Sequence, residues 1–305
     1  MSVKTAVQPT KTRSASLSGA IARGGIHIFL LFVGLLCLLP MWLVVVYSFS
    51  DDVLVAEKGI SLLPQGFTTY AYEFIFTFPE QVLRSYGVTI LVAGLGTVGG
   101  ITISSLLGYA LSRSYFKLRR GLVFYCVFTM LFNAGMVPTY LVVKTMLRLH
   151  KSPLAVLVLT TMVIPWYIMM FRAYFAGLPP EILESARIDG AGEWRLFFSI
   201  ALPLARPWMA TIGLMYILKY WNEWIPALLY VEDPNWYPLQ YLLQVMMRNV
   251  AALQAMIQAV GTQIKIPGPS LRMAMVVVAA GPAMFVFMLL QRYFVRGITS
   301  GAVKG

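Results

Sequence analysis

The sequence predicts an all-α membrane protein with six transmembrane helices. Of its 305 residues, 59% are hydrophobic, and the mean hydropathy is +0.74, which lies outside the range of soluble domains. Six apolar runs each approach the roughly 20 residues that cross a hydrocarbon core of ~30 Å. A polar, charged segment separates the fourth run from the fifth. We expect that segment to form a short helix outside the membrane.

The six predicted spans lie, in chain order, at residues 26–48, 88–111, 121–143, 153–175, 207–230 and 273–293. The first run is too long for a secretory signal and no small-residue cleavage site follows it, so we interpret it as a retained anchor. Residues 1–22 are polar, basic and rich in Ser and Thr, which predicts a disordered tail. The remaining residues, 23–305, then form one transmembrane domain.

The distribution of basic residues predicts that both chain ends are cytoplasmic. Fifteen of the 24 Lys and Arg residues lie in the N-terminal tail, the second-to-third connection, the fourth-to-fifth connection and the C-terminal end. That face carries a net charge of about +11, against about +1 for the opposite face. The third-to-fourth connection does not follow this pattern, because it is predicted to lie on the outer face although Lys144, Arg148 and Lys151 make it basic. This connection is short, and the larger number of basic residues in the other connections and the chain ends determines the predicted orientation.

Two connections on the predicted outer face are long. Residues 51–83 contain five acidic residues and several aromatic ones, and residues 231–272 contain the uncharged stretch 249–263. The second connection is typical of a helix that lies on or above the membrane. Both are expected to be available to an extracellular partner.

The polar segment at residues 177–206 predicts two short helices. Residues 180–189 combine acidic residues near the start, where the helix dipole favours them, with an apolar side. Gly190 follows the last apolar position, where a left-handed cap is easiest for glycine. A second helical piece, 193–200, ends before Pro203.

This segment resembles the signature of the membrane permease subunits of bacterial ABC importers, which reads Glu-Ala-Ala, three residues, Gly, nine residues, Ile, any residue, Leu-Pro. Ser185 replaces the first Ala of the signature. The resemblance implies a type I ABC importer permease fold with a cytoplasmic coupling helix between the fourth and fifth spans. It also implies that the segment docks into a cleft on a separate ATPase through Glu184, Ser185, Ala186, Asp189, Gly190, Ile200, Leu202 and Pro203.

Other stretches resemble the carbohydrate branch of these permeases, the maltose-type importers. They are the Ile-Asp-Gly-Ala run at 188–191, the Trp-Asn-Glu run at 221–223, and residues 132–140 and 294–305, which are similar to a subgroup assigned to complex oligosaccharides and polysaccharides. The resemblance implies a sugar substrate, a second homologous permease, two ATPase subunits and an extracellular solute-binding protein. It implies alternating access in a bacterial cell membrane.

No cofactor is expected in this chain. It contains no Gly-Lys dipeptide, so it has no phosphate-binding loop of the Walker type. ATP and Mg would therefore be bound by the partner ATPase, and the chain itself is not expected to be an enzyme. Its positive charge gathers on one face of a membrane protein, which argues against a nucleic-acid partner.

Polar residues within predicted spans suggest a substrate pathway, because charge at membrane depth usually faces a cavity or a partner. Lys219 and Glu223 are four residues apart and suited to pair along a helix. An alternative is a structural ion pair with interfacial aromatics. In the third span, Asn133 precedes Gly135 and Pro138, which suits either a broken helix lining a site or a simple kink. The pathway candidates are Asn133, Lys219, Trp221, Asn222, Glu223 and Trp224.

Three other functions stay open from the residues alone. An ABC permease for a non-sugar solute would share the docking segment. An intramembrane enzyme would need a catalytic cluster, and the chain has only His27 and His150, far apart in sequence. A stand-alone channel would need no docking segment.

Overall fold

The computed structural model describes residues 17–260 and 268–302, and all regular elements in these ranges are helical. Side chains are described for residues 24–257, 259 and 268–288. The elements are, in order, α1 (Leu17–Ser48), α2 (Asp52–Lys58), α3 (Tyr70–Ile75), α4 (Pro79–Ser112), α5 (Arg119–Leu131), α6 (Met136–Leu141), η1 (Val142–Met146), η2 (Leu149–Lys151), α7 (Pro153–Met162), α8 (Pro165–Ala176), α9 (Pro180–Ile188), α10 (Glu193–Arg195), η3 (Leu196–Ala201), α11 (Leu202–Leu204), α12 (Arg206–Asn222), α13 (Ile225–Tyr230), η4 (Pro234–Trp236), α14 (Leu239–Val260) and α15 (Pro269–Ala302). Of the expected tail, residues 1–16 lie outside this description, whereas α1 already begins at Leu17.

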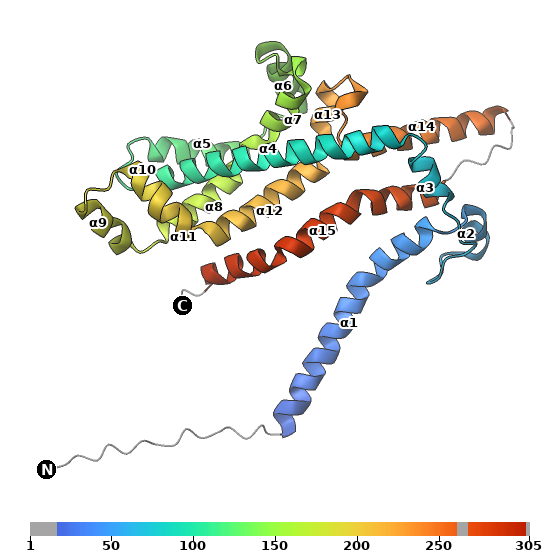
Figure 1. Cartoon of the computed structure of the whole chain (residues 1–305), viewed down its shortest axis with the longest axis horizontal. Coiled ribbons are helices and arrows are strands. Elements are labelled where there is room, and N and C mark those ends of the chain that lie inside the picture. The colour runs from blue at the N-terminus through green and yellow to red at the C-terminus, as the bar shows by residue number, and fades with distance from the viewer. Residues whose placement is uncertain (1–16, 261–267, 303–305) are drawn as a thin grey trace.

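Among the residues that the structure describes, three helices are long and apolar enough to cross a membrane by themselves: α1, α4 and α15. The second span is longer than expected, because α4 begins at Pro79 rather than near residue 88. Proline at the first helical position suits the start of a helix, where its missing N–H is not needed. α1 packs against α15 and otherwise diverges from the rest of the chain (Figure 1).

Three further spans are broken rather than continuous. The pairs Arg119–Leu131 with Met136–Met146, Pro153–Met162 with Pro165–Ala176, and Glu193–Leu204 with Arg206–Asn222 are bent by 118°, 47° and 78°. If each bent pair is one span, the described residues hold up to six. The predicted fifth span also differs, because α12 ends at Asn222 and α13 begins only at Ile225. The helices expected over 153–175 and 207–230 are therefore interrupted. In the third span the structure shows the broken helix rather than the simple kink, the two alternatives that the sequence left open.

The core forms where α4 packs against α8 and α12. A Cβ added to Gly96 would lie 2.1 Å from the Tyr220 ring, and one added to Gly100 would lie 2.6 Å from the Tyr216 ring. The tyrosines of α12 can reach α4 only because these two positions carry no side chain. Small residues of this kind let helices approach closely in membranes.

Tyr216 and Tyr220 also donate hydrogen bonds to α7, close to the break between α7 and α8. The Tyr216 hydroxyl donates to the Met162 carbonyl at 3.0 Å, and the Tyr220 hydroxyl donates to the Val158 carbonyl at 2.7 Å. α7 ends at Met162, so no later turn of α7 supplies an N–H for the Met162 carbonyl, which needs another donor. The core thus stabilises a helix interruption within the bundle.

A second apolar cluster lies at the end of the molecule that is farther from α9 (Figure 1). There α3 and α14 pack with the first half of α15 around Ile75, Leu239 and Leu271, all almost fully buried. The helix expected within residues 231–272 is confirmed as α14. Asp52 fixes the start of α15, because its carboxylate accepts the N–H groups of Gly268 and Ser270 at 2.7 and 2.8 Å.

Candidate functional site

The helix α9 stands at one extremity of the molecule and exposes most of its surface (Figure 1). Leu183 is its one buried residue, with 3% of its surface exposed, and it anchors the helix to the body. Glu184 and Ser185 are exposed, and Ala186 is half-buried. Ile188 is 87% exposed, which is unusual for a large apolar side chain. This surface suits contact with another protein.

The end of α9 is capped as its sequence predicts. Gly190 has φ of +81°, a conformation that costs other L residues free energy. The Ala191 N–H donates to the Ala186 carbonyl at 2.9 Å, and the Gly190 N–H donates to the Arg187 carbonyl at 2.9 Å. These two bonds form a Schellman motif. Asp189, the residue before Gly190, is exposed.

A network of side chains fastens α9 to the end of α4. The Glu193 carboxylate accepts from Arg187 at 3.0 Å, from the Tyr115 hydroxyl at 2.7 Å and from the Tyr109 hydroxyl at 3.3 Å. The Arg187 guanidinium also donates to Tyr115 and lies over its ring. We refer to these four residues as the Glu193 network. Sequence reasoning missed it, because its members are up to 84 residues apart.

The Glu193 network shifts the pKa of Glu193 and of Tyr115. Burial alone would raise the pKa of the Glu193 carboxyl, but the Tyr115 hydrogen bond and the Arg187 charge outweigh it and lower the pKa below its ordinary value. Burial and the hydrogen bond to Glu193 raise the pKa of Tyr115. Glu193 therefore stays an anion, and the Tyr115 hydroxyl stays a protonated donor.

The last three positions of the docking segment do not share the exposed surface of α9. Ile200 lies in η3, a π-helical stretch on which α9 packs, and Leu202 packs against the main core. Pro203 lies in α11, just before the 78° bend that leads into α12. The structure thus separates an exposed set around Glu184 from a supporting set around Ile200.

Three helix interruptions meet at one cleft of about 480 Å³: the breaks between α5 and α6 and between α7 and α8, and the junction between α12 and α13. Each interruption supplies lining residues: Asn133 and Gly135 from the third span, Val163 and Ile164 from the fourth, and Glu223 from the fifth. Irregular backbone at membrane depth is tolerated where it lines a cavity. The convergence of three breaks is therefore the geometry expected of a pathway.

The break in the third span is sharper than a proline kink. Gly135 has φ of +87°, and its N–H donates to the Asn133 side-chain oxygen at 2.8 Å. This local bond replaces a helical one and turns the chain by 118°. One lone pair of the Asn133 oxygen is used in this way, so its amide N–H groups and the second lone pair are left for a ligand.

Lys219 and Glu223 pair as the sequence predicts, with 2.6 Å between Nζ and Oε2. Both line the first cleft, and both also line a second, adjoining cleft of about 700 Å³ with Asn222 and Trp224. The structure therefore brings together five of the six pathway candidates.

Trp221 is the exception. It is 6% exposed, and its indole N–H donates to the Ala279 carbonyl at 2.9 Å. It packs within the second apolar cluster, against α15, and lines neither cleft. In this structure Trp221 is a packing residue rather than a wall of the pathway.

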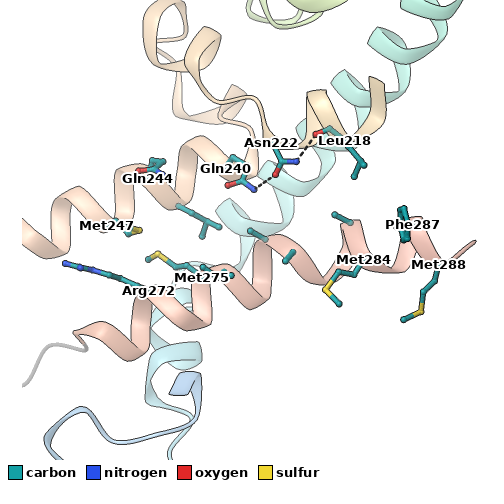
Figure 2. Close-up of a pocket in the computed structure, with 15 residues that line it drawn as sticks. Leu218, Asn222, Gln240, Gln244, Met247, Arg272, Met275, Met284, Phe287 and Met288 are labelled. Atoms are coloured by element: carbon teal, nitrogen blue, oxygen red, sulfur yellow. Dashed lines mark hydrogen bonds between the residues drawn. The ribbon is translucent and has the colours of Figure 1, made fainter. Parts of the chain in front are cut away.

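A third cleft of about 680 Å³ lies on the other side of Asn222, between α12, α14 and α15 (Figure 2). Asn222 donates to the Leu218 carbonyl at 2.8 Å and accepts a long hydrogen bond from Gln240 at 3.4 Å. Gln244 and Arg272 extend the polar lining along the cleft. Sequence reasoning missed these three residues, although Gln240 and Gln244 lie four apart and so share one face of α14.

Interrupted apolar helices around adjoining clefts that contain a few polar groups, with a capped helix projecting beyond them, are typical of a membrane transport permease. Over residues 100–300 the chain matches the inner membrane component of binding-protein-dependent transport systems, and it belongs to that family. The family consists of transport components, which supports the expectation that this chain is not an enzyme.

Individual relatives are similar over nearly the whole chain. The polygalacturonan/rhamnogalacturonan transport system permease protein YtcP of Bacillus subtilis is 37% identical, covering 92% of this chain and 97% of its own. Protein LplC of the same organism is 34% identical, covering 91% and 93%. A solved bacterial ABC transporter involved in the import of the acidic polysaccharide alginate matches with a TM-score of 0.72 and 25% identity, covering 94% and 100%.

Proposed function

We propose that this chain is the permease subunit of an ATP-driven, binding-protein-dependent importer of oligosaccharides. It spans the bacterial cell membrane six times, with each bent pair counted as one span, and both termini are cytoplasmic. A second, homologous permease supplies the other half of the pathway. Two ATPase subunits bind ATP and Mg, and an extracellular solute-binding protein delivers the sugar. The chain itself carries out no covalent chemistry.

The geometry of α9 is the observation that supports this proposal most strongly. A membrane protein driven by a separate ATPase needs a rigid, exposed element that transmits movement. α9 is rigid because a Schellman motif closes its end and the Glu193 network fastens it to α4. It is exposed through Glu184, Ser185 and Ile188. We assign α9 as the coupling helix.

The clefts support the transport step. ATP binding would draw the two coupling helices together and turn the bundle outward, and hydrolysis would reset it. Such alternating access requires two packings close in free energy. The interrupted spans provide the flexible points at which one packing converts to the other.

The oligosaccharide class rests on the relatives. YtcP is named for polygalacturonan and rhamnogalacturonan, and the matching transporter structure imports alginate. The amide and charged groups of the clefts are of the kind that bind sugar hydroxyls. We therefore assign the same broad class of substrate to this chain.

A bulky residue on α9 tests the proposal. Ser185→Trp would place an indole where the ATPase cleft must close on α9. We expect this variant to lose co-purification of the ATPase and at least about tenfold of ATP-driven sugar uptake, since a misfitted interface commonly costs more than 1.4 kcal/mol. Thr77→Trp is the matched control for co-purification of the ATPase, because Thr77 is exposed just after α3, at the end of the molecule away from α9 (Figure 1). Normal assembly and normal uptake by Ser185→Trp would contradict the proposal.

A further inference from the structure

The third cleft contains an apolar floor and a line of polar side chains. Phe287 and four methionines form the floor, and Asn222, Gln240, Gln244 and Arg272 supply the polar groups. In Figure 2, Gln240 and Gln244 follow one another along α14, and Arg272 of α15 lies on the side next to Met247. Methionine side chains adapt to ligands of irregular shape. The cleft therefore suits an elongated molecule with polar groups along one edge.

Arg272 is an exposed cation at the edge of this cleft, with no acidic partner among the described residues. Among the residues that the structure describes, the ion pairs are Arg187 with Glu193 and Lys219 with Glu223, and Arg272 has no hydrogen-bond partner. The carboxylate at the start of the same helix, Asp52, is already occupied by Gly268 and Ser270. A guanidinium has five donors and no acceptor. The ligand that best satisfies it is a carboxylate or phosphate.

The three clefts adjoin one another around the end of α12. The third shares Leu218 and Asn222 with the second, and the second shares Lys219 and Glu223 with the first. Arg272 thus lies at one end of these adjoining clefts, near the start of α15 and far from α9 (Figure 1). With α9 on the cytoplasmic side, that end is where a substrate enters.

We propose that the third cleft binds an acidic sugar chain, with Arg272 receiving a sugar carboxylate. This inference rests on the proposed function and narrows its substrate to oligosaccharides that contain uronic acids. The side-chain amides of Gln240 and Gln244 take the sugar hydroxyls, and the planar guanidinium takes the carboxylate through two parallel hydrogen bonds. A lipid would use the methionine floor and leave the glutamine amides unpaired. A sugar chain satisfies both.

The test compares an acidic sugar with its neutral ester in the complete transporter, reconstituted in liposomes with its solute-binding protein. The sugars are an oligogalacturonide and the same oligosaccharide with its carboxylates methyl-esterified. Each variant is compared with the wild type for the same sugar, so any preference of the binding protein cancels. Arg272→Gln removes the charge, Arg272→Lys keeps the charge without the planar fork, and Arg248→Gln is the control. Arg248 is an exposed cation of α14 that does not line the cleft.

We expect Arg272→Gln to lower uptake of the acidic sugar about tenfold, the loss of one charge-assisted contact, and to leave uptake of the ester within about twofold. Arg272→Lys should lower only the acidic uptake, to a smaller degree. Arg248→Gln should change neither. If Arg272→Gln does not assemble with the ATPase, Arg272→Lys carries the same comparison.

Equal losses for both sugars, or no loss for either, would overturn the inference and leave the proposed function standing. Equal losses would mean that Arg272 contacts the second permease or a lipid phosphate. A wild-type complex that transports only the ester would also overturn it. A wild-type complex that transports neither sugar, nor any other oligosaccharide, would overturn the proposed function itself.

Discussion

The end of α9 and the junction between α12 and α13 both interrupt helical structure, but they differ in how fully their polar groups are satisfied. At α9, two backbone bonds close the helix end and three side chains surround the Glu193 carboxylate. At the α12–α13 junction, the Lys219–Glu223 pair is the main polar contact, and it lies between two clefts. The polar groups at the end of α9 are thus bonded within the protein, whereas those at the α12–α13 junction face clefts.

This difference matches what each region must do in a transporter. An element that transmits force has to keep its shape, so its local bonds should survive the change between states. A substrate pathway has to rearrange, so its contacts should be few and replaceable. The same chain therefore combines two contrasting regions. We refer to α9 and the Glu193 network as the rigid end, and to the α12–α13 junction with its clefts as the adaptable end. The helices α4 and α12 join them.

The largest expected effect comes from straining the rigid end. Gly190→Ala forces a residue with a Cβ to adopt φ near +81°, at a cost of about 1–2 kcal/mol. We expect the cap of α9 to loosen and sugar uptake per ATP hydrolysed to fall roughly tenfold. Uptake and ATPase activity, measured together in the reconstituted complex, check this.

Gly192→Ala is the matched control for Gly190→Ala. A Cβ added at either position would have no atom within 4 Å, so neither substitution creates a clash. Gly192 has φ of −73°, which any residue adopts. If both variants behave alike, the strained conformation at Gly190 does not explain the rigidity of α9.

The rigid end was largely predictable from sequence, because its determinants are local. The bounds of α9 and the left-handed Gly190 follow from composition and from the position of glycine after a helix. The bonds of Glu193 to Tyr109 and Tyr115 were not predictable, since they join residues 84 and 78 apart. No local pattern contains such a contact.

The adaptable end was predicted less well, for two reasons. Average hydropathy conceals interruptions, so Pro165 and Pro226 were placed inside continuous spans although each marks the start of a new helix. In addition, the polar and aromatic residues between 219 and 224 were treated as one set of pathway candidates. At about 100° per residue, Lys219 and Glu223 share a face of α12 while Trp221 points to the opposite side, as the structure shows. Periodicity alone would have separated them.

The second prediction concerns the charge within the Glu193 network. Glu193→Gln should destabilise the complex by less than about 1 kcal/mol, because Arg187 and Glu193 are both more than a third exposed and water weakens the pair. The pKa of Glu193 is lowered on folding. Its stabilisation is therefore complete above the ordinary pKa of 4.5 and is lost as the pH falls through the lowered value.

Thermal unfolding of the wild type and Glu193→Gln measures this at several pH values. The difference in midpoint temperature should stay constant between about pH 6 and 8 and shrink below about pH 4.5. Arg195→Gln is a suitable control, since Arg195 is exposed in the same short helix, α10, and lies outside the network. A difference that grows on acidification would show that Glu193 does not act as an anion there.

The smallest effect on stability is expected at the adaptable end. The Lys219 side chain is 49% exposed and the pair is of the i, i+4 type, so Lys219→Met should cost no more than about 0.5 kcal/mol. Uptake should respond more strongly than stability, because the variant leaves Glu223 without its cation in both clefts and so repels an acidic sugar. We expect the midpoint temperature to stay within error of the wild type while the apparent affinity for an acidic oligosaccharide falls.

Glu223→Gln should change the affinity in the opposite direction, since it frees the Lys219 cation. A large loss of stability with unchanged affinity would instead make the pair a structural element, and the contrast between the two regions would then disappear.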